Sequence, residues 1–252
     1  IVSTPIGNLG DITLRAIEIL KACDAIVCED TRVTGNLLKL LGIPKKELIS
    51  FHGHTHPQKL DDILERLTQG QHLALVSDAG TPGISDPGYA LISRITKEQT
   101  CHGALSHPAR AQRDAASEFI VPARAGMAKG NPMNSLHLTP VPGPSAFLAA
   151  LSASGLPINQ FTYMGFLPIK KGRQTLLQSL TTEERTIVFY ESVHRIERTL
   201  VELAEVFADQ PERAIVLCRE LTKLHEEVIH ATMADLSHIA KTIMNKGECV
   251  II

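Results

Sequence analysis

The stretch SDAGTPGISDPG at residues 77–88 decides the fold, because it directly follows the apolar run of residues 72–76. Small residues, two prolines and two carboxylates crowd into this loop. In an open α/β sheet, ligands bind beyond the carboxyl ends of the strands, where small residues let a ligand approach the backbone. The stretch therefore predicts a ligand-binding loop, and a tight structural turn is the alternative.

Outward from this loop, short apolar runs alternate with amphipathic helical runs. The glycine-rich stretch at residues 3–11 is a second turn of the same kind, and Asp11 or Thr13 can cap the helix that follows it. Gly42 stands where a helix ends in the left-handed conformation. We expect helices at 11–22, 31–41 and 57–68, and strands at 25–28, 48–51 and 72–76. This order predicts an α/β domain with a largely parallel sheet.

A second set of elements follows the Pro-Gly-Pro of residues 142–144, which marks a domain boundary. We expect an N-terminal α/β domain at 1–142 and a C-terminal α/β domain at 143–252. The second domain's expected helices are 145–153, 193–207 and 234–244, and its strands 186–190, 214–218 and 249–252. Residues 100–134 lie between a helix expected to end near residue 95 and a strand expected near 136–141. They show neither period, which predicts a poorly ordered insertion in the first domain or a stretch foreign to the protein.

Composition narrows the class of protein. The 252 residues are 44% hydrophobic with a net charge of −2, which argues against a surface coated in basic charge. Five scattered cysteines, an odd number, predict reduced thiols in a cytoplasmic protein and no metal site. No apolar run is long enough to span a bilayer, so no membrane partner is expected. Ile1 and Ile252 stand inside apolar runs, so we expect the chain to be cut within strands at both ends.

Seven motifs occur in order along the chain, at residues 3–11, 29–32, 78–88, 141–146, 165–173, 190–195 and 219–227. In these motifs the chain resembles the ribosomal RNA small-subunit cytidine-2′-O-methyltransferase branch of the tetrapyrrole methylase superfamily, over nearly its whole length except residues 100–134. It departs from the family at Val33, Gly35 and Asn36, and at residues 52–55, where local RNA contacts are expected to differ.

The resemblance implies two α/β domains with S-adenosylmethionine (SAM) bound in a cleft between them, and a homodimer. It implies methyl transfer to the ribose 2′-hydroxyl of a cytidine in 16S rRNA of the small ribosomal subunit. It also gives nine positions that match the family's cofactor pocket: Pro5, Ala79, Gly80, Thr81, Ile84, Ser145, Ala146, Glu191 and Leu221.

Methyl transfer to a hydroxyl gains from a nearby base. The candidates at predicted strand ends are Glu29, Asp30, His52 and His54, with Asp30 alternatively capping a helix and the histidines alternatively surface residues. The candidates for RNA phosphate are Arg32, Lys170, Lys171 and Arg173, and a solvated helix start is the other interpretation of the last three. The mixed charges of residues 219–227 face the site or form structural ion pairs.

Two other functions stay open. One is a small-molecule methylase of the tetrapyrrole type, and the other is a noncatalytic RNA-binding protein whose site the insertion disrupts. The basic loop at residues 170–173 and the motif at 190–195 favour the rRNA methyltransferase.

Overall fold

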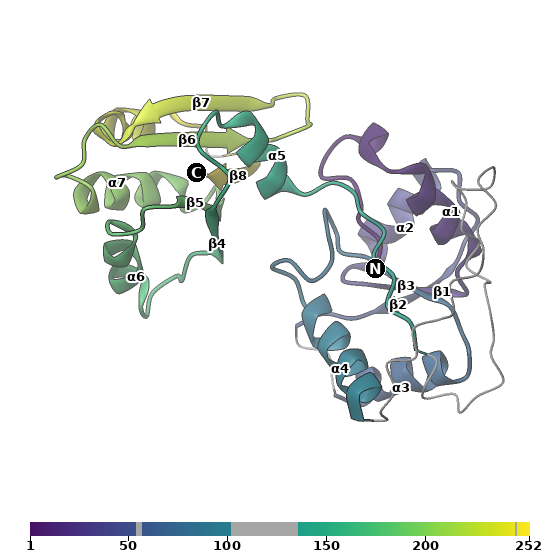
Figure 1. Cartoon of the computed structure of the whole chain (residues 1–252). Coiled ribbons are helices and arrows are strands. Elements are labelled where there is room, and N and C mark those ends of the chain that lie inside the picture. Colours follow the sequence, from purple (N-terminus) through teal and green to yellow (C-terminus); the bar gives the residue numbers. More distant parts are fainter. Residues whose placement is uncertain (54–56, 102–135, 245) are drawn as a thin grey trace. The chain divides into compact units, whose positions relative to one another are not determined.

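The computed structural model describes residues 1–53, 57–101, 136–244 and 246–252 (Figure 1). The chain divides into two compact units, and each is described by itself. Unit 1 comprises Ile1–Pro5 and Leu9–Pro144, and unit 2 comprises Ile6–Asn8 and Ser145–Ile252. The division after Pro144 falls two residues beyond the boundary expected from the sequence. Ile6–Asn8 pack with unit 2 although they lie near the start of unit 1 in the sequence, and no sequence pattern predicts this.

Unit 1 is built on a parallel sheet of order β2-β1-β3. The strands are β1 (Ala25–Cys28), β2 (Glu47–Ser50) and β3 (Leu73–Leu75). Val2 extends the sheet, because its amide donates to the carbonyl of Leu75 at 2.8 Å and it forms a parallel bridge with Val141. The largely parallel sheet predicted for this part of the chain is confirmed.

Alternation along β1 separates two cores in unit 1. Ile26 and Cys28 point to a cluster that includes Ala16 and Leu20 of α1 (Leu14–Ala22) and Leu38 of α2 (Thr31–Leu40). Val27 points to the opposite cluster, which α3 (Pro57–Thr68) and α4 (Gly88–Cys101) complete. Because successive strand residues face opposite sides, the sheet is covered by helices on both faces.

Unit 2 holds a five-stranded mixed sheet of order β4-β5-β8-β6-β7. Strands β4 and β5 are parallel, whereas β8 runs antiparallel to both β5 and β6, and β7 is antiparallel to β6. The five strands are β4 (Phe161–Phe166), β5 (Thr186–Ser192), β6 (Ala214–Arg219), β7 (Glu227–Thr232) and β8 (Glu248–Ile251).

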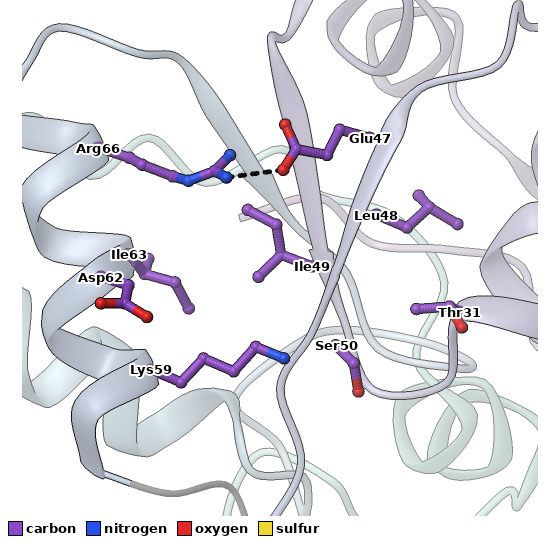
Figure 2. Close-up of a pocket in the computed structure, with 9 residues that line it drawn as sticks. All are labelled: Thr31, Glu47, Leu48, Ile49, Ser50, Lys59, Asp62, Ile63 and Arg66. Carbon is purple, nitrogen blue, oxygen red and sulfur yellow. Dashed lines mark ion pairs between the residues drawn. The ribbon is translucent and has the colours of Figure 1, made fainter.

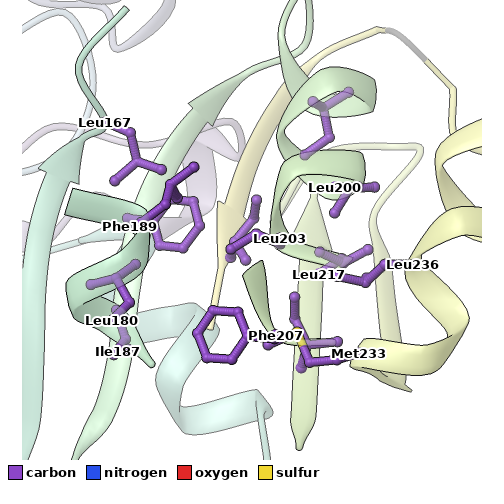
Figure 3. Packing of buried hydrophobic residues seen from close by; sticks show 14 of the residues in the cluster. Leu167, Leu180, Ile187, Phe189, Leu200, Leu203, Phe207, Leu217, Met233 and Leu236 are labelled. Atoms are coloured by element: carbon purple, nitrogen blue, oxygen red, sulfur yellow. The ribbon is translucent and has the colours of Figure 1, made fainter. Parts of the chain in front are cut away.

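One face of this sheet carries the largest core cluster (Figure 3). Leu180, Leu200 and Leu236 come from three helices and pack on Phe189 and Leu217 of the strands. The opposite face is covered by α5 (Ala146–Ala153), which contacts β5 and β8. The three helices of the large cluster are α6 (Arg173–Leu180), α7 (Ile196–Val206) and α8 (Leu236–Thr242).

Several local predictions need correction. The helix expected from residue 11 is divided into the short 3-10 helix η1 (Leu9–Asp11) and α1, and Thr13 is the cap that accepts from the amide of Ala16. Leu14, expected on the buried face, is 81% exposed. The last expected helix begins as the 3-10 helix η3 (Met233–Asp235).

Three elements were not expected, namely β4, α6 and β7. The helix expected to end near residue 95 is α4, which continues to Cys101, and the strand expected near 136–141 is reduced to the single bridge of Val141 with Val2. Thr100 and Cys101 belong to α4, and the rest of the insertion expected at 100–134 lies outside the described residues. Within the described part of the chain, no helix combines the length and apolarity needed to cross a membrane.

Candidate active site

Polar residues collect at the carboxyl edge of the unit 1 sheet. Because β1, β2 and β3 are parallel, the residues that follow them lie along one edge, as the sequence predicted. Glu29 follows β1, His52 follows β2, and Asp78 follows β3. The amide of Asp30 donates to the carboxylate of Asp78 at 3.0 Å, which ties the first and third of these loops together.

Glu29 is the carboxylate at this edge whose pKa is raised. Its burial raises the pKa above the ordinary 4.5, and the negative charges of Asp78 and Asp86 raise it further, while His52 opposes the rise. A carboxylate with a raised pKa is a stronger proton acceptor than a normal one. Glu29 therefore has the electrostatic setting of a general base.

Asp30 has the opposite setting. Its side chain accepts from the amide of Arg32 at 2.8 Å and so caps α2. The Arg32 guanidinium approaches the same carboxylate to 2.6 Å, and these hydrogen bonds hold the pKa of Asp30 at about 2. Asp30 is thus the helix cap that the sequence offered as an alternative, and it is a weak base. The guanidinium of Arg32 remains largely exposed.

The conformation of the loop at residues 77–88 is fixed by hydrogen bonds to one of its own carboxylates, Asp86. Asp86 accepts from the amide of Gly83 at 2.8 and 2.9 Å and from the amide of Gly88 at 2.7 Å. Gly80 and Gly83 have φ of 81° and 90°, a conformation that side chains disfavour. Ala79 at the tip is exposed. Asp86 therefore fixes a compact loop in which Gly80 is buried and bonded to Thr4 through both its amide and its carbonyl, while Ala79 is exposed.

The N-terminal turn packs closely on the neighbouring loops. The hydroxyl of Ser3 lies 3.0 Å from that of Thr81, which in turn donates to the carbonyl of Pro144 at 3.0 Å. A Cβ on Gly143 would stand 2.8 Å from the Cβ of Ser3, so this position requires glycine. Three separate chain segments are thereby fixed at the same sheet edge.

A hollow of about 330 Å³ lies between β2 and α3 (Figure 2). Arg66 of α3 reaches Glu47 of β2 at 2.7 Å and, by its hydrogen bond, lowers the pKa of that carboxyl. Lys59 and Asp62 also line the hollow, so its charges balance. None of the nine cofactor positions expected from the sequence lines it.

Unit 2 buries a charged network at the carboxyl ends of β4 and β5. Glu191, on β5, is fully buried, and its carboxylate lies 2.7 Å from Arg195 and 3.5 Å from Arg173. Thr199 donates to Glu191 and accepts from Arg173, both at 2.7 Å. The two guanidiniums also donate to the carbonyls of Leu167 and Pro168, which fixes the loop between β4 and α6.

This network corrects two predictions. Arg173 is 4% exposed and pairs with Glu191 and, at 2.7 Å, with Glu202, so the prediction that it contacts RNA phosphate is wrong. The carboxylate of Glu191 is likewise committed to the protein's own groups, which leaves only its backbone for a ligand. Lys170 and Lys171 remain exposed on the loop.

The turn between β6 and β7 gathers the charges of residues 219–227. Lys223 pairs with Glu220 at 2.8 Å and with Glu248 at 3.0 Å, and Arg219 pairs with Glu227 at 3.0 Å. These are the structural ion pairs that the sequence offered as an alternative. The hydroxyl of Thr222 accepts from the amide of Asn8 at 3.1 Å, which joins the segment Ile6–Asn8 to this turn.

Of the two histidines predicted as candidate bases, the structure describes one. His52 is exposed at the carboxyl edge of unit 1, and His54 lies outside the described residues. Among the described residues, no group of three or more His, Cys, Asp or Glu side chains could hold a metal ion. The roles of Asp78 and Asp86 were not assigned from the sequence, although their place in the loop after a buried strand was the available signal.

Comparisons with known proteins agree with this architecture. Residues 1–103 and 131–237 match the family described as Tetrapyrrole (Corrin/Porphyrin) Methylases. Two solved structures share the fold at a TM-score of 0.58. Cobalt precorrin-4 methyltransferase is 15% identical and uroporphyrin-III-C-methyltransferase from Thermus thermophilus 16% identical, each over 99% of this chain and 92% and 91% of theirs.

Curated relatives are similar over the whole chain. The protein named ribosomal RNA small subunit methyltransferase I from Escherichia coli O157:H7 is 42% identical over 100% of this chain and 76% of its own length. Proteins of the same name from Xylella fastidiosa strain Temecula1 and Synechocystis are 43% and 41% identical, with 79% and 77% of their lengths covered.

Proposed function

We propose a function from the premise that this chain belongs to the ribosomal RNA small subunit methyltransferase I family, a branch of the tetrapyrrole methylases. It is a methyltransferase that uses SAM. Its substrate is the ribose 2′-hydroxyl of a cytidine in 16S rRNA. The observation that carries this proposal is Glu29, a carboxylate of raised pKa at the carboxyl edge of unit 1.

The residues at this edge fit the cofactor. When bound, SAM supplies an electrophilic methyl group on a positively charged sulfonium. Glu29, Asp78 and Asp86 make the edge electronegative, which suits a cation. The positive φ of Gly80 and Gly83 lets the 77–88 loop turn tightly beside these carboxylates. The proposed cofactor positions remain Pro5, Ala79, Gly80, Thr81 and Ile84 in unit 1, and Ser145, Ala146, Leu221 and the backbone of Glu191 in unit 2.

Glu29 is the base that we select among the candidates. It accepts the proton of the 2′-hydroxyl, and its raised pKa makes it better suited to this than Asp30, whose pKa is about 2. Asp78 and Asp86 contribute by raising that pKa while their oxygens hold backbone amides in place.

Lys170, Lys171 and Arg32 are the proposed phosphate contacts. The two lysines are exposed on a loop whose carbonyls accept hydrogen bonds from the buried Arg173 and the partly buried Arg195. Fixed cations lose little entropy when they meet phosphate, which favours binding. We further propose that the enzyme acts as a homodimer on the small ribosomal subunit in the cytoplasm, where its buried thiols stay reduced.

The test is methyl transfer from radiolabelled SAM to small subunits that lack the modification. The wild type is expected to label a cytidine 2′-oxygen, and Glu29→Gln is expected to lower kcat by about 10²–10⁴-fold. Asp78→Asn is the comparison variant, since it keeps a side-chain oxygen for the Asp30 amide. Labelling of a free tetrapyrrole in place of RNA would support the small-molecule alternative, and RNA binding without any SAM binding would support the noncatalytic one.

A separate binding experiment tests the cofactor loop. Gly80→Trp places a large side chain at a position with φ of 81°, and calorimetry is expected to show loss of SAM binding. Unchanged affinity in a folded Gly80→Trp variant would show that the loop is not part of the cofactor site.

A further inference from the structure

Five aromatic rings form a continuous row across the α5 face of the unit 2 sheet. Neighbouring ring centres lie 4.6–6.1 Å apart, so each ring packs on the next. The row runs in the order Phe161, Phe147, Tyr163, Tyr190 and Phe166. We call these residues the aromatic row.

The two ends of the aromatic row differ from its middle. Phe147 is 8% exposed, whereas Phe166 is 55% exposed and Phe161 is 37% exposed. Phe161 begins β4 and Phe166 ends it, so the two exposed rings belong to opposite ends of the strand. Tyr190 supports Phe166 from inside, with ring centres 5.3 Å apart.

Only the Phe166 end of the row stands beside the basic loop. Lys170 and Lys171 follow Phe166 closely, both are exposed, and neither pairs with a carboxylate of the described residues. No Asp or Glu occurs between Glu118 and Glu183 in the sequence, so no acidic side chain from α5, β4 or this loop neutralises them. The loop carbonyls of Leu167 and Pro168 are held by Arg195 and Arg173.

We infer that Phe166 is a stacking platform for an unpaired base of the RNA substrate, with Lys170 and Lys171 on the adjoining phosphates. An exposed ring beside fixed cations is the arrangement that binds single-stranded nucleic acid, because the ring takes the base and the cations take the backbone. The inference deepens the proposed function and rests on it. It requires the target region to be unpaired when it binds.

The experiment uses a short single-stranded RNA that carries one 2-aminopurine, and the same RNA annealed to its complement. Stacking on Phe166 is expected to quench the fluorophore in the single strand but not in the duplex. Phe166→Ala is expected to weaken single-strand binding by about 5- to 150-fold, the range for loss of one stacked base. The salt dependence should stay unchanged, because no cation is removed.

Two variants sharpen the result. Phe166→Trp keeps a ring and should retain affinity and quenching, whereas Phe166→Leu keeps apolar volume without a ring and should behave as Phe166→Ala. Phe161→Ala is the matched control, since it removes the exposed ring at the far end of the row and should leave RNA affinity unchanged. Circular dichroism and thermal unfolding establish that each variant is folded.

Each other outcome has a defined meaning. Equal RNA affinity of the wild type and folded Phe166→Ala would overturn the inference while leaving the proposed function intact. A change of sedimentation in both Phe161→Ala and Phe166→Ala, without loss of RNA binding, would overturn it in favour of a protein interface. Failure of the wild type to bind any RNA would reject the proposed function itself.

Discussion

The carboxyl edges of the two sheets carry charges of opposite sign. In unit 1 the carboxylates of Glu29, Asp78 and Asp86 raise one another's electrostatic energy, and Asp78 and Asp86 accept hydrogen bonds from backbone amides instead of pairing with cations. In unit 2 the carboxylate of Glu191 is buried between two arginines, and the charges left outside are lysines. An edge that is electronegative suits a cationic cofactor, and an edge that displays cations suits a polyanion. The same fold element, the carboxyl end of parallel strands, thus carries opposite charge in the two units.

Removing the buried anion of unit 2 should give the largest effect on stability. Glu191→Ala leaves the buried Arg173 and the partly buried Arg195 without their shared carboxylate, and we expect a loss of about 3–5 kcal/mol in the free energy of unfolding. Urea denaturation measures it. Glu183→Ala, which breaks a pair with the exposed Arg185, is the control and should cost far less. Equal losses in the two variants would mean that the burial of Glu191 does not increase its contribution to stability.

The acidic edge of unit 1 should reveal itself in the pH dependence of methyl transfer. Glu29 acts as a base only when deprotonated, so kcat should fall about tenfold per pH unit below its raised pKa, which lies above 4.5. Glu29→Gln should remove this limb, and Asp30→Asn should retain it.

The same shift has a stability consequence of defined sign. A carboxyl whose folded pKa is raised binds its proton more tightly in the folded state, so it destabilises the fold once the pH exceeds that pKa. Glu29→Gln should therefore raise the unfolding midpoint at neutral pH even as it lowers activity. A lowered midpoint would indicate that Glu29 stabilises the loops as a carboxylate.

The exposed cations Lys170 and Lys171 of unit 2 should make RNA affinity depend on the salt concentration. The double variant Lys170→Ala with Lys171→Ala is expected to reduce the slope of log affinity against log salt by about 1.4 for single-stranded RNA, at ~0.7 for each phosphate neutralised. SAM affinity should not change. A slope equal to that of the wild type would place the RNA contact elsewhere on the molecule.

The smallest expected effect compares one helix cap in each unit. Thr13→Ala removes the hydroxyl that accepts from the amide of Ala16 and should cost about 0.5–2 kcal/mol. Ser145 stands at the same position before α5 but makes no capping hydrogen bond with its side chain. Ser145→Ala should thus leave thermal stability nearly unchanged while weakening SAM binding, if its proposed role is right.

Much of unit 1 could be predicted from the sequence because its signals are local. The helix Pro57–Thr68 has a clean apolar period, the buried strand Ala25–Cys28 has no polar residue, and Gly42 ends its helix with φ of 64°. The common edge of Glu29 and Asp78 followed from the order of strands and helices alone.

The elements that were not predicted depend on contacts distant in sequence. The charges before strand Glu227–Thr232 have a spacing typical of a helix. In the structure Lys223 instead pairs with the distant Glu248, and the strand itself pairs with β6. Arg173 belongs to a run of cations typical of a surface, and its burial follows from Glu191, Thr199 and Glu202. Strand Phe161–Phe166 contains a glycine with φ of 62° and an irregular register, which weakens its alternation.

The three residues Ile6–Asn8 affect how the protein can be made and cut. They are synthesised before the rest of unit 2, yet Asn8 contacts a turn that is synthesised more than two hundred residues later. The contacts of Ile6–Asn8 with the turn at Thr222 and Lys223 consequently cannot form until that turn has been synthesised. A fragment beginning at Ser145 would lack these three residues, which contact that turn. After a single proteolytic cut behind Pro144, the first fragment would still carry Ile6–Asn8, whose packing on unit 2 would hold the two fragments together without a covalent bond.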